Sequence, residues 1–164
     1  MIKNRAQRVA VLVDVANLYH SAKNLYNSRV EFKETLKHSV DNRHLTRAIA
    51  YVIKSETEEE TQFFEALYQQ GFEVKMKDLQ IFAGGVKKAD WDVGITVDAI
   101  KLSDKVDSIV LVTGDGDYVP LVGYLQSKGC LVEVTAFHQT ASSKLLEVAD
   151  NFLDLSSSKR FLRK

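Results

Sequence analysis

The sequence predicts a single α/β domain with three layers, in which a mainly parallel sheet lies between two layers of helices. Residues 8–14 and 109–112 are short apolar runs rich in β-branched side chains, which is typical of strands buried on both faces of a parallel sheet. Segments with helical spacing follow both runs, and strands that alternate with helices form parallel βαβ units. The chain has 164 residues and no internal repeat or low-complexity linker, so one packed domain is expected.

The first half of the chain predicts two strands, each followed by a helix, with an ambiguous stretch between them. The strand at 8–14 precedes an amphipathic helix that runs to about residue 26. Residues 27–45 are polar and mixed, and they predict at most a short helix around 32–40. A strand is then predicted over 45–53 and a helix over 55–70.

The helix over 55–70 has sequence signals at both ends. Thr57 and Glu60 match a capping box at its start, and Gly71 is expected to end it. The acidic run at 58–60 lies in the first turn, where it suits the positive end of the helix dipole. These acidic residues therefore need no functional explanation.

The second half of the chain repeats the alternation of strands and helices. It predicts strands at 72–77 and 79–83, a basic loop at 84–88, a helix at 90–103, the strand at 109–112, a helix at 117–127, a strand at 131–137 and a helix at 142–149. Pro120 falls in the first turn of its helix, where the missing N–H costs nothing.

Charge is balanced overall but uneven along the chain. The 22 basic and 22 acidic residues cancel, which excludes the uniform basic field of many nucleic-acid-binding proteins. The first eight residues nevertheless carry three basic residues and the last nine carry four, with no acidic residue in either segment. These basic ends could simply be solvated termini. Alternatively, they could help to bind a polyanion whose reacting phosphate lies over a cluster of acidic residues.

Composition favours a cytoplasmic protein. No apolar run approaches the roughly 20 residues of a membrane span, and we expect neither a signal peptide nor a membrane partner. Cys130 is the only cysteine, so an internal disulfide is excluded and a reducing compartment fits. The four histidines show no spacing that is typical of a zinc site.

Carboxylates gather where predicted strands end. Asp14 and Asp115 each follow a buried strand, and the ends of two neighbouring strands lie about 5 Å apart, here at the switch point of a Rossmann-like sheet. Asp92 opens a helix and Asp117 follows Asp115 by two residues. Such carboxylates repel each other by up to ~4 kcal/mol per close pair at an effective dielectric of 20. A cluster of them therefore predicts a bound Mg²⁺ or Mn²⁺, with metal-activated water attacking a phosphodiester as the natural chemistry.

Each of these acidic residues also has a purely structural interpretation. Asp14 and Asp117 could cap the helices that follow them, and Asp92 is well placed as an ordinary acidic residue in a first turn. Asp115 is harder to explain in this way, because Gly114 and Gly116 on both sides of it give more backbone freedom than a turn requires. The prediction of a metal site therefore depends on the four aspartates taken together and not on any one of them.

Three nearby residues complete the candidate site. Asn17 could orient water or a phosphate oxygen, or it could be an ordinary polar residue of a first turn. Lys88, in a glycine-rich loop with Lys87, could hold a phosphate or simply be exposed. Trp91 could stack on a base or serve as a buried anchor. Asp98 lies about 120° around the helix from Asp92, so we do not expect the two to share one metal directly.

Four segments of the sequence resemble the NYN-domain proteins, which are PIN-like nucleases, and most closely their LabA-like branch. The segments read VDVANLY at 13–19, KADWDVGITVD at 88–98 and TGDGDY at 113–118, followed by Ser142, Leu145, Ala149, Asp150 and Phe152. Each segment alone is a weak signal. Together they occur in the order of the family and span almost the whole chain.

The resemblance implies a PIN-like Rossmann-type domain over residues 1–155, followed by a basic C-terminal tail at 156–164. It also implies Mg²⁺- or Mn²⁺-dependent cleavage of RNA. The family's acidic metal site falls on Asp14, Asp92, Asp115 and Asp117, its accompanying polar position on Asn17, and a further common aspartate on Asp98. The chain departs from the family at residues 15–16, where Val-Ala replaces a pair that often contains Gly and an acidic residue.

Two functions from different classes follow. The first is a cytoplasmic metal-dependent ribonuclease in which Asp14, Asp92, Asp115 and Asp117 hold the cation and act in catalysis, Asn17 and Lys88 contact single-stranded RNA, and the protein is a monomer or a homodimer. The second is a non-catalytic RNA-binding or regulatory module that keeps the metal site. A Toprim-like phosphotransfer domain and a phosphate-acceptor signalling domain are weaker alternatives, since Toprim domains usually begin with a catalytic Glu where this chain has Asp14.

Overall fold

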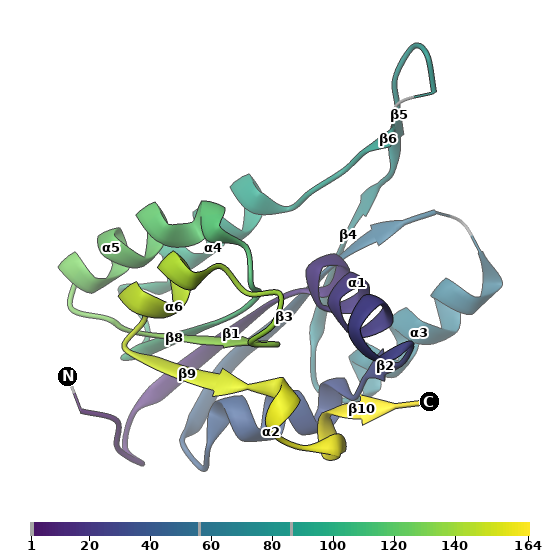
Figure 1. The fold of residues 1–164 in the computed structure, drawn as a ribbon. Helices are drawn as coiled ribbons and strands as arrows, with labels where there is room; N and C mark the ends of the chain where they lie inside the picture. The colour runs from purple at the N-terminus through teal and green to yellow at the C-terminus, as the bar shows by residue number, and fades with distance from the viewer. Residues whose placement is uncertain (1, 56, 86) are drawn as a thin grey trace.

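A six-stranded, all-parallel sheet forms the middle layer of the computed structural model, which describes residues 2–55, 57–85 and 87–164 apart from the side chains of residues 87 and 88 (Figure 1). In spatial order its strands are β4 (Glu73–Asp78), β3 (His44–Lys54), β1 (Arg8–Asp14), β7 (Ser108–Val112), β8 (Leu131–Ala136) and β9 (Asn151–Asp154). Every neighbouring pair runs in parallel. The predicted three-layer α/β fold is confirmed.

The order in which the chain adds strands to the sheet reverses at β1, and this reversal places the candidate site. The chain builds β3 and β4 on one side of β1, then crosses back and adds β7, β8 and β9 on the other side. β1 and β7 are direct neighbours, with Val13 paired to Val112 at their carboxyl ends. Ligands of open α/β sheets bind outside the carboxyl ends of the strands at this type of reversal. Asp14 and the loop after β7 therefore meet there, as the sequence predicts.

Helices cover both faces of the sheet, because the side chains of the buried strands alternate and place apolar residues on both faces. α1 (Val15–Tyr26), α2 (Phe32–Val40) and α3 (Glu58–Gln69) pack on one face, and α4 (Asp92–Leu102), α5 (Val119–Ser127) and α6 (Ser143–Val148) pack on the other. Val9, Val11 and Val13 point to the first layer, whereas Ala10 and Leu12 point to the second. None of the helices in the described ranges is long and apolar enough to cross a membrane.

Most of the local signals act as predicted, with one exception at the site. Thr57 and Glu60 form the capping box of α3, and Gly71 follows this helix with φ +102°. α5 begins at Val119, after the short 3₁₀ helix η1 (Gly116–Tyr118). Asp115, and not Asp117, provides the cap of η1, because the Asp115 side chain accepts a hydrogen bond from the backbone N–H of Asp117.

The stretch between β4 and α4 is a hairpin that projects from the body of the domain (Figure 1). β5 (Gln80–Ile81) pairs in antiparallel fashion with β6 (Lys87–Lys88). Gly84 and Gly85 have φ +91° and +80° and lie in the turn, where glycine is favoured. The sequence predicts a short strand here, but it assigns residues 84–88 wholly to a loop.

The end of the chain folds back onto the domain. After β9, which the sequence analysis did not predict, come η2 (Leu155–Ser157), η3 (Lys159–Phe161) and β10 (Leu162–Arg163), and β10 pairs with β2 (Arg29–Val30). Leu155 and Phe161 are fully buried in the core beneath α1 and α2. The basic segment at 156–164 is thus anchored by apolar residues, although its composition alone resembles a solvated tail.

Candidate metal centre

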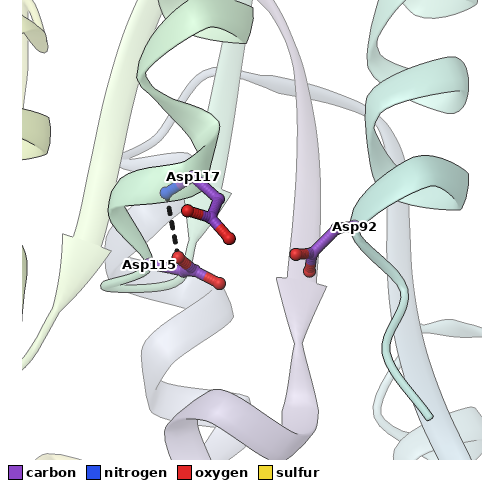
Figure 2. Close-up of side chains that lie close together, drawn as sticks. All are labelled: Asp92, Asp115 and Asp117. Atoms are coloured by element: carbon purple, nitrogen blue, oxygen red, sulfur yellow. Dashed lines mark hydrogen bonds between the residues drawn. The ribbon is translucent and has the colours of Figure 1, made fainter. Parts of the chain in front are cut away.

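Three carboxylates face one another at the switch point of the sheet (Figure 2). Asp92 is the first residue of α4, Asp115 lies in the loop after β7, and Asp117 belongs to η1. One oxygen from each of the three can be chosen so that all lie within 4.8 Å of one another. Asp92 and Asp115 are half-buried and Asp117 is exposed, so the group is open to solvent on one side.

The loop that carries Asp115 and Asp117 is held by close packing. A Cβ atom on Gly114 would lie 3.0 Å from Cα of Ala141, and one on Gly116 would lie 2.7 Å from Oγ of Ser142. The backbone N–H of Ser142 donates to the Gly114 carbonyl at 2.8 Å. Neither glycine has positive φ among the described residues. These glycines therefore serve the close approach of the segment before α6, and not the backbone freedom that the sequence suggests.

Asp14 lies beside the three carboxylates but outside the group that comes within 4.8 Å. Its two oxygens accept hydrogen bonds from the Asn17 N–H at 3.3 Å and from the Thr113 hydroxyl at 3.4 Å. Asp14 is thus also the cap of α1. Burial, together with the charges of Asp92 and Asp115, raises the pKa of Asp14 to about 6, although the Asn17 hydrogen bond opposes the shift.

Asn17 ties the first helix to the acidic loop. Its side-chain oxygen accepts a hydrogen bond from the Gly114 N–H at 2.9 Å. This contact joins the start of α1 to the turn after β7, two elements that lie far apart in the sequence. The Asn17 amide nitrogen donates no hydrogen bond within the described residues, so it is the part of this side chain that a ligand could engage.

Asp92 is positioned by the residue before it, Trp91, and by a hydrogen bond from Tyr118. Trp91 donates its indole N–H to the Val52 carbonyl at 2.9 Å, and the Lys77 ammonium lies 4.4 Å from the centre of its ring. Trp91 is therefore a half-buried anchor. Burial raises the pKa of Asp92, as do the nearby acidic residues, while a hydrogen bond from the Tyr118 hydroxyl acts in the opposite direction.

Asp98, on the same helix, points to a different environment. It accepts hydrogen bonds from the Tyr51 hydroxyl and from the Lys75 ammonium, both at 2.7 Å. Burial alone would raise the pKa of Asp98, but these contacts lower it below the usual value. Asp98 is not part of the carboxylate group within 4.8 Å, in line with its angular offset on α4.

Of the basic residues that the sequence offers for binding RNA, those of the N-terminal segment lie away from the acidic residues, and the side chain of Lys88 is not described. Arg8 is paired with Asp107 at the amino end of β1, whereas the site lies at the carboxyl ends of the strands. Lys3 is paired with Asp41 and Glu133. The N-terminal segment therefore does not lie at the acidic centre. The backbone of Lys88 belongs to β6, and its side chain is outside the described part of the structure.

Asp92, Asp115 and Asp117, with Asp14 beside them, form an acidic centre that has the donor atoms a hard divalent cation requires. All of its side chains offer carboxylate oxygens, the ligands that Mg²⁺ and Mn²⁺ prefer. Among the ion pairs of the described residues, none involves Asp14, Asp92, Asp115 or Asp117. The mutual repulsion of these groups is therefore not balanced by a basic side chain of the described part. A bound divalent cation would balance it.

Comparison with known proteins agrees with this architecture. Residues 8–156 match the NYN domain. The low amplitude and bright protein LabA of Synechococcus elongatus is 24% identical over 169 residues, which cover 98% of this chain and 90% of that protein. A protein of unknown function from Vibrio parahaemolyticus is 34% identical, and its crystal structure matches with a TM-score of 0.89 over 99% of this chain and 100% of that one. The chain belongs to the NYN domain family.

Proposed function

We propose that this protein is a metal-dependent ribonuclease that hydrolyses phosphodiester bonds of RNA. The observation that carries the proposal is the convergence of Asp92, Asp115 and Asp117 at the switch point of an NYN domain, without a balancing basic side chain among the described residues. Exposed acidic groups are common without a metal. These carboxylates, however, come from two segments that are separate in the sequence, the start of α4 and the stretch from the loop after β7 into η1, and they meet at the carboxyl ends of the strands, where ligands of this fold class bind.

The proposed roles follow from the placement of each side chain. Asp92, Asp115 and Asp117 hold Mg²⁺ or Mn²⁺ directly, and Asp14 acts on the same centre directly or through water. A bound cation supplies charge stabilisation at the phosphate and activation of water. Asn17 holds the acidic loop through its oxygen and can offer its amide N–H to a phosphate oxygen. Lys88 is proposed to bind the RNA backbone from the projecting hairpin.

The proposed substrate is single-stranded RNA in the cytoplasm. NYN domains act on nucleic acid, and the centre is open to solvent at Asp117. We propose RNA as the form of nucleic acid on the basis of the family. A homodimer is compatible with the proposal, because all the proposed ligands come from one chain.

Cleavage of a labelled oligonucleotide tests the proposal directly. Wild-type protein is incubated with single-stranded RNA in Mn²⁺, in Mg²⁺ and in EDTA, with an Asp14→Asn variant beside it. We expect products only with a divalent cation, and strongly reduced cleavage by the variant. Cleavage that persists in EDTA, or that is unchanged in the variant, would contradict the assignment.

A non-catalytic RNA-binding module is the second candidate. It is favoured by one specific observation, namely that both oxygens of Asp14 already accept protein hydrogen bonds. In that case Mn²⁺ raises the melting temperature by binding the native state and promotes RNA retention, but no product forms. The Toprim-like and phosphate-acceptor alternatives lose their basis, because the chain belongs to the NYN family.

A further inference from the structure

Two buried tyrosines donate hydrogen bonds to two aspartates of one helix. Tyr118, from η1, donates to Asp92 Oδ1 at 3.1 Å, and Tyr51, from β3, donates to Asp98 Oδ2 at 2.7 Å. Both tyrosine residues are only 1% exposed. The two contacts look alike, but only that of Tyr118 reaches a carboxylate of the acidic centre.

The Tyr118 contact leaves one oxygen of Asp92 free for a cation. Oδ1 of Asp92 accepts the tyrosine hydroxyl, and Oδ2 has no donor among the described residues. Asp115 is held in the same way. Its Oδ1 accepts a hydrogen bond from the Asp117 N–H at 2.9 Å, and its Oδ2 has no donor within the described part. Each of these two carboxylates is thus oriented through one oxygen, and the other remains available as a ligand.

Tyr118 also connects the two elements that build the centre. Its backbone belongs to η1, between the loop of Asp115 and the start of α5, whereas its hydroxyl reaches the first turn of α4. The ring packs in the hydrophobic core between α4, α5 and α6. Since the Tyr118 hydroxyl makes the only hydrogen bond to the Asp92 side chain in the described residues, it is what fixes the orientation of this carboxylate relative to Asp115 and Asp117.

We propose that Tyr118 is a positioning residue for the metal site, which holds Asp92 so that its second oxygen faces Asp115 and Asp117. This inference rests on the proposed metal site. Outer partners that orient metal ligands typically account for 10- to 100-fold in metal affinity or activity when they are removed. Tyr118 acts through Asp92 and does not itself contact the cation.

A Tyr118→Phe variant removes the hydroxyl and keeps the buried ring. Tyr51→Phe is the matched control, because it removes an equally buried hydroxyl that serves an aspartate of the same helix outside the acidic centre. Mn²⁺ affinity is measured by calorimetry and by the electron paramagnetic resonance signal of bound Mn²⁺, and the melting temperature of each metal-free variant is measured alongside. RNA cleavage is then titrated with Mn²⁺.

We expect Tyr118→Phe to weaken Mn²⁺ binding about 10-fold or more, and Tyr51→Phe to leave it within about 2-fold of wild type. Cleavage by Tyr118→Phe should approach the wild-type rate at saturating Mn²⁺, since a positioning defect raises the metal requirement.

Equal Mn²⁺ affinities in the three proteins would overturn the inference, as would equal losses in both variants. If wild type binds Mn²⁺ without cleaving RNA, the proposed function fails while the affinity comparison still decides the role of Tyr118. If wild type does not bind Mn²⁺, both fail.

Discussion

α4 carries one aspartate at its first position, Asp92, and another near its middle, Asp98, and each accepts a hydrogen bond from a buried tyrosine, yet the two sites have opposite electrostatic character. At one site Asp98 also accepts from Lys75, and its pKa is lowered. At the other, Asp92 faces further carboxylates, and its pKa is raised. The local hydrogen bond is the same, so the difference comes from what the neighbouring strands and loops supply.

This difference separates a structural acidic residue from a candidate functional one. Asp98 lies next to β4, an edge strand whose Lys75 neutralises it, and the result is a satisfied ion pair. Asp92 lies next to the switch point, where the loop after β7 supplies Asp115 and Asp117. Keeping like charges together costs free energy, and a cation that binds only the folded state recovers it.

The largest expected effect comes from removing a carboxylate of the acidic centre. Asp115→Asn should reduce RNA cleavage by at least about 100-fold, because a preorganised electrostatic group in a catalytic site typically contributes on that order. It should also abolish or strongly reduce the rise in melting temperature that Mn²⁺ causes in wild type. Rates from single-turnover cleavage and melting curves with and without Mn²⁺ measure the two effects.

Asp98→Asn is the matched control for this variant. It removes one charge from the same domain, but at the compensated site, so cleavage and the response to Mn²⁺ should both stay close to wild type. If Asp98→Asn were as inactive as Asp115→Asn, the distinction between the two sites would be lost.

The second effect is a pH dependence of stability in the metal-free protein. The pKa of Asp14 is about 6 in the folded state and 3.8 in the reference state. Between these values the folded chain holds a proton that the unfolded chain has released, so the contribution of Asp14 to stability is fully present below about pH 4 and is lost as pH rises through 6. The loss from Asp14 alone amounts to about 3 kcal/mol at 1.36 kcal/mol per pKa unit, and Asp92 adds a loss of the same sign.

Urea unfolding in EDTA between pH 4 and pH 7 measures this dependence. Asp14→Asn should flatten it and make the metal-free variant more stable than wild type at pH 7, because the buried charge is gone. Asp98 should contribute in the opposite direction, since its pKa is lowered and its stabilisation is lost as pH falls below about 4. A wild-type stability that rises steadily from pH 4 to pH 7 would contradict the role assigned to Asp14.

The acidic centre was predictable because its residues follow directly from the order of strands. β1 and β7 are apolar runs that end in Asp14 and in the Gly114–Asp115 turn, and parallel strands present their carboxyl ends at one edge. The neighbourhood of β1 and β7 and the helical start at Asp92 are confirmed. The sequence does not fix side-chain distances, so it could not separate Asp14 from the tighter group of three.

Other features depend on contacts that no local pattern records. Tyr51 lies in an apolar segment typical of a buried strand, and Tyr118 directly follows the turn at 114–117. Only tertiary packing brings their hydroxyls to the two aspartates. The C-terminal segment is polar and basic, and its packing depends on a few apolar residues, namely Leu155, Phe161 and the partly buried Leu162. β9 is a short edge strand with half-buried side chains, so its alternation is too weak to mark it.

A smaller effect is expected from Gly94, which lies in the first turn of α4. A Cβ atom there would lie 2.5 Å from Cε3 of Trp91, so Gly94→Ala must displace the anchor next to Asp92. We expect a loss of about 1–2 kcal/mol in stability, since overpacking outweighs the gain in helix propensity. Weaker Mn²⁺ binding and a shifted emission of the single tryptophan should accompany it.

Gly123→Ala is the control for this change. Gly123 lies within α5, and an added Cβ would meet nothing within 4 Å. The substitution should therefore stabilise the protein by roughly 0.5–1 kcal/mol through helix propensity alone. A Gly94→Ala variant that is as stable as Gly123→Ala would show that the Trp91 anchor can shift without cost.

The smallest effect is expected at the compensated site itself, from Lys75→Met. The Lys75–Asp98 pair is partly exposed, with side chains 39% and 16% accessible, so its loss should cost no more than about 1 kcal/mol. The variant leaves Asp98 with the Tyr51 hydrogen bond but without its ion-pair partner, while the more distant charges of Lys101 and Arg47 remain. We nevertheless expect no second Mn²⁺ in calorimetry, because a hard cation needs several oxygen ligands and Asp98 belongs to no group of three acidic or metal-binding side chains within 4.8 Å in the described residues. A new Mn²⁺ site in this variant would mean that a carboxylate on α4 needs only to lose its ion-pair partner to bind the cation, whereas its absence would locate the requirement in the convergence of Asp92 with the loop after β7.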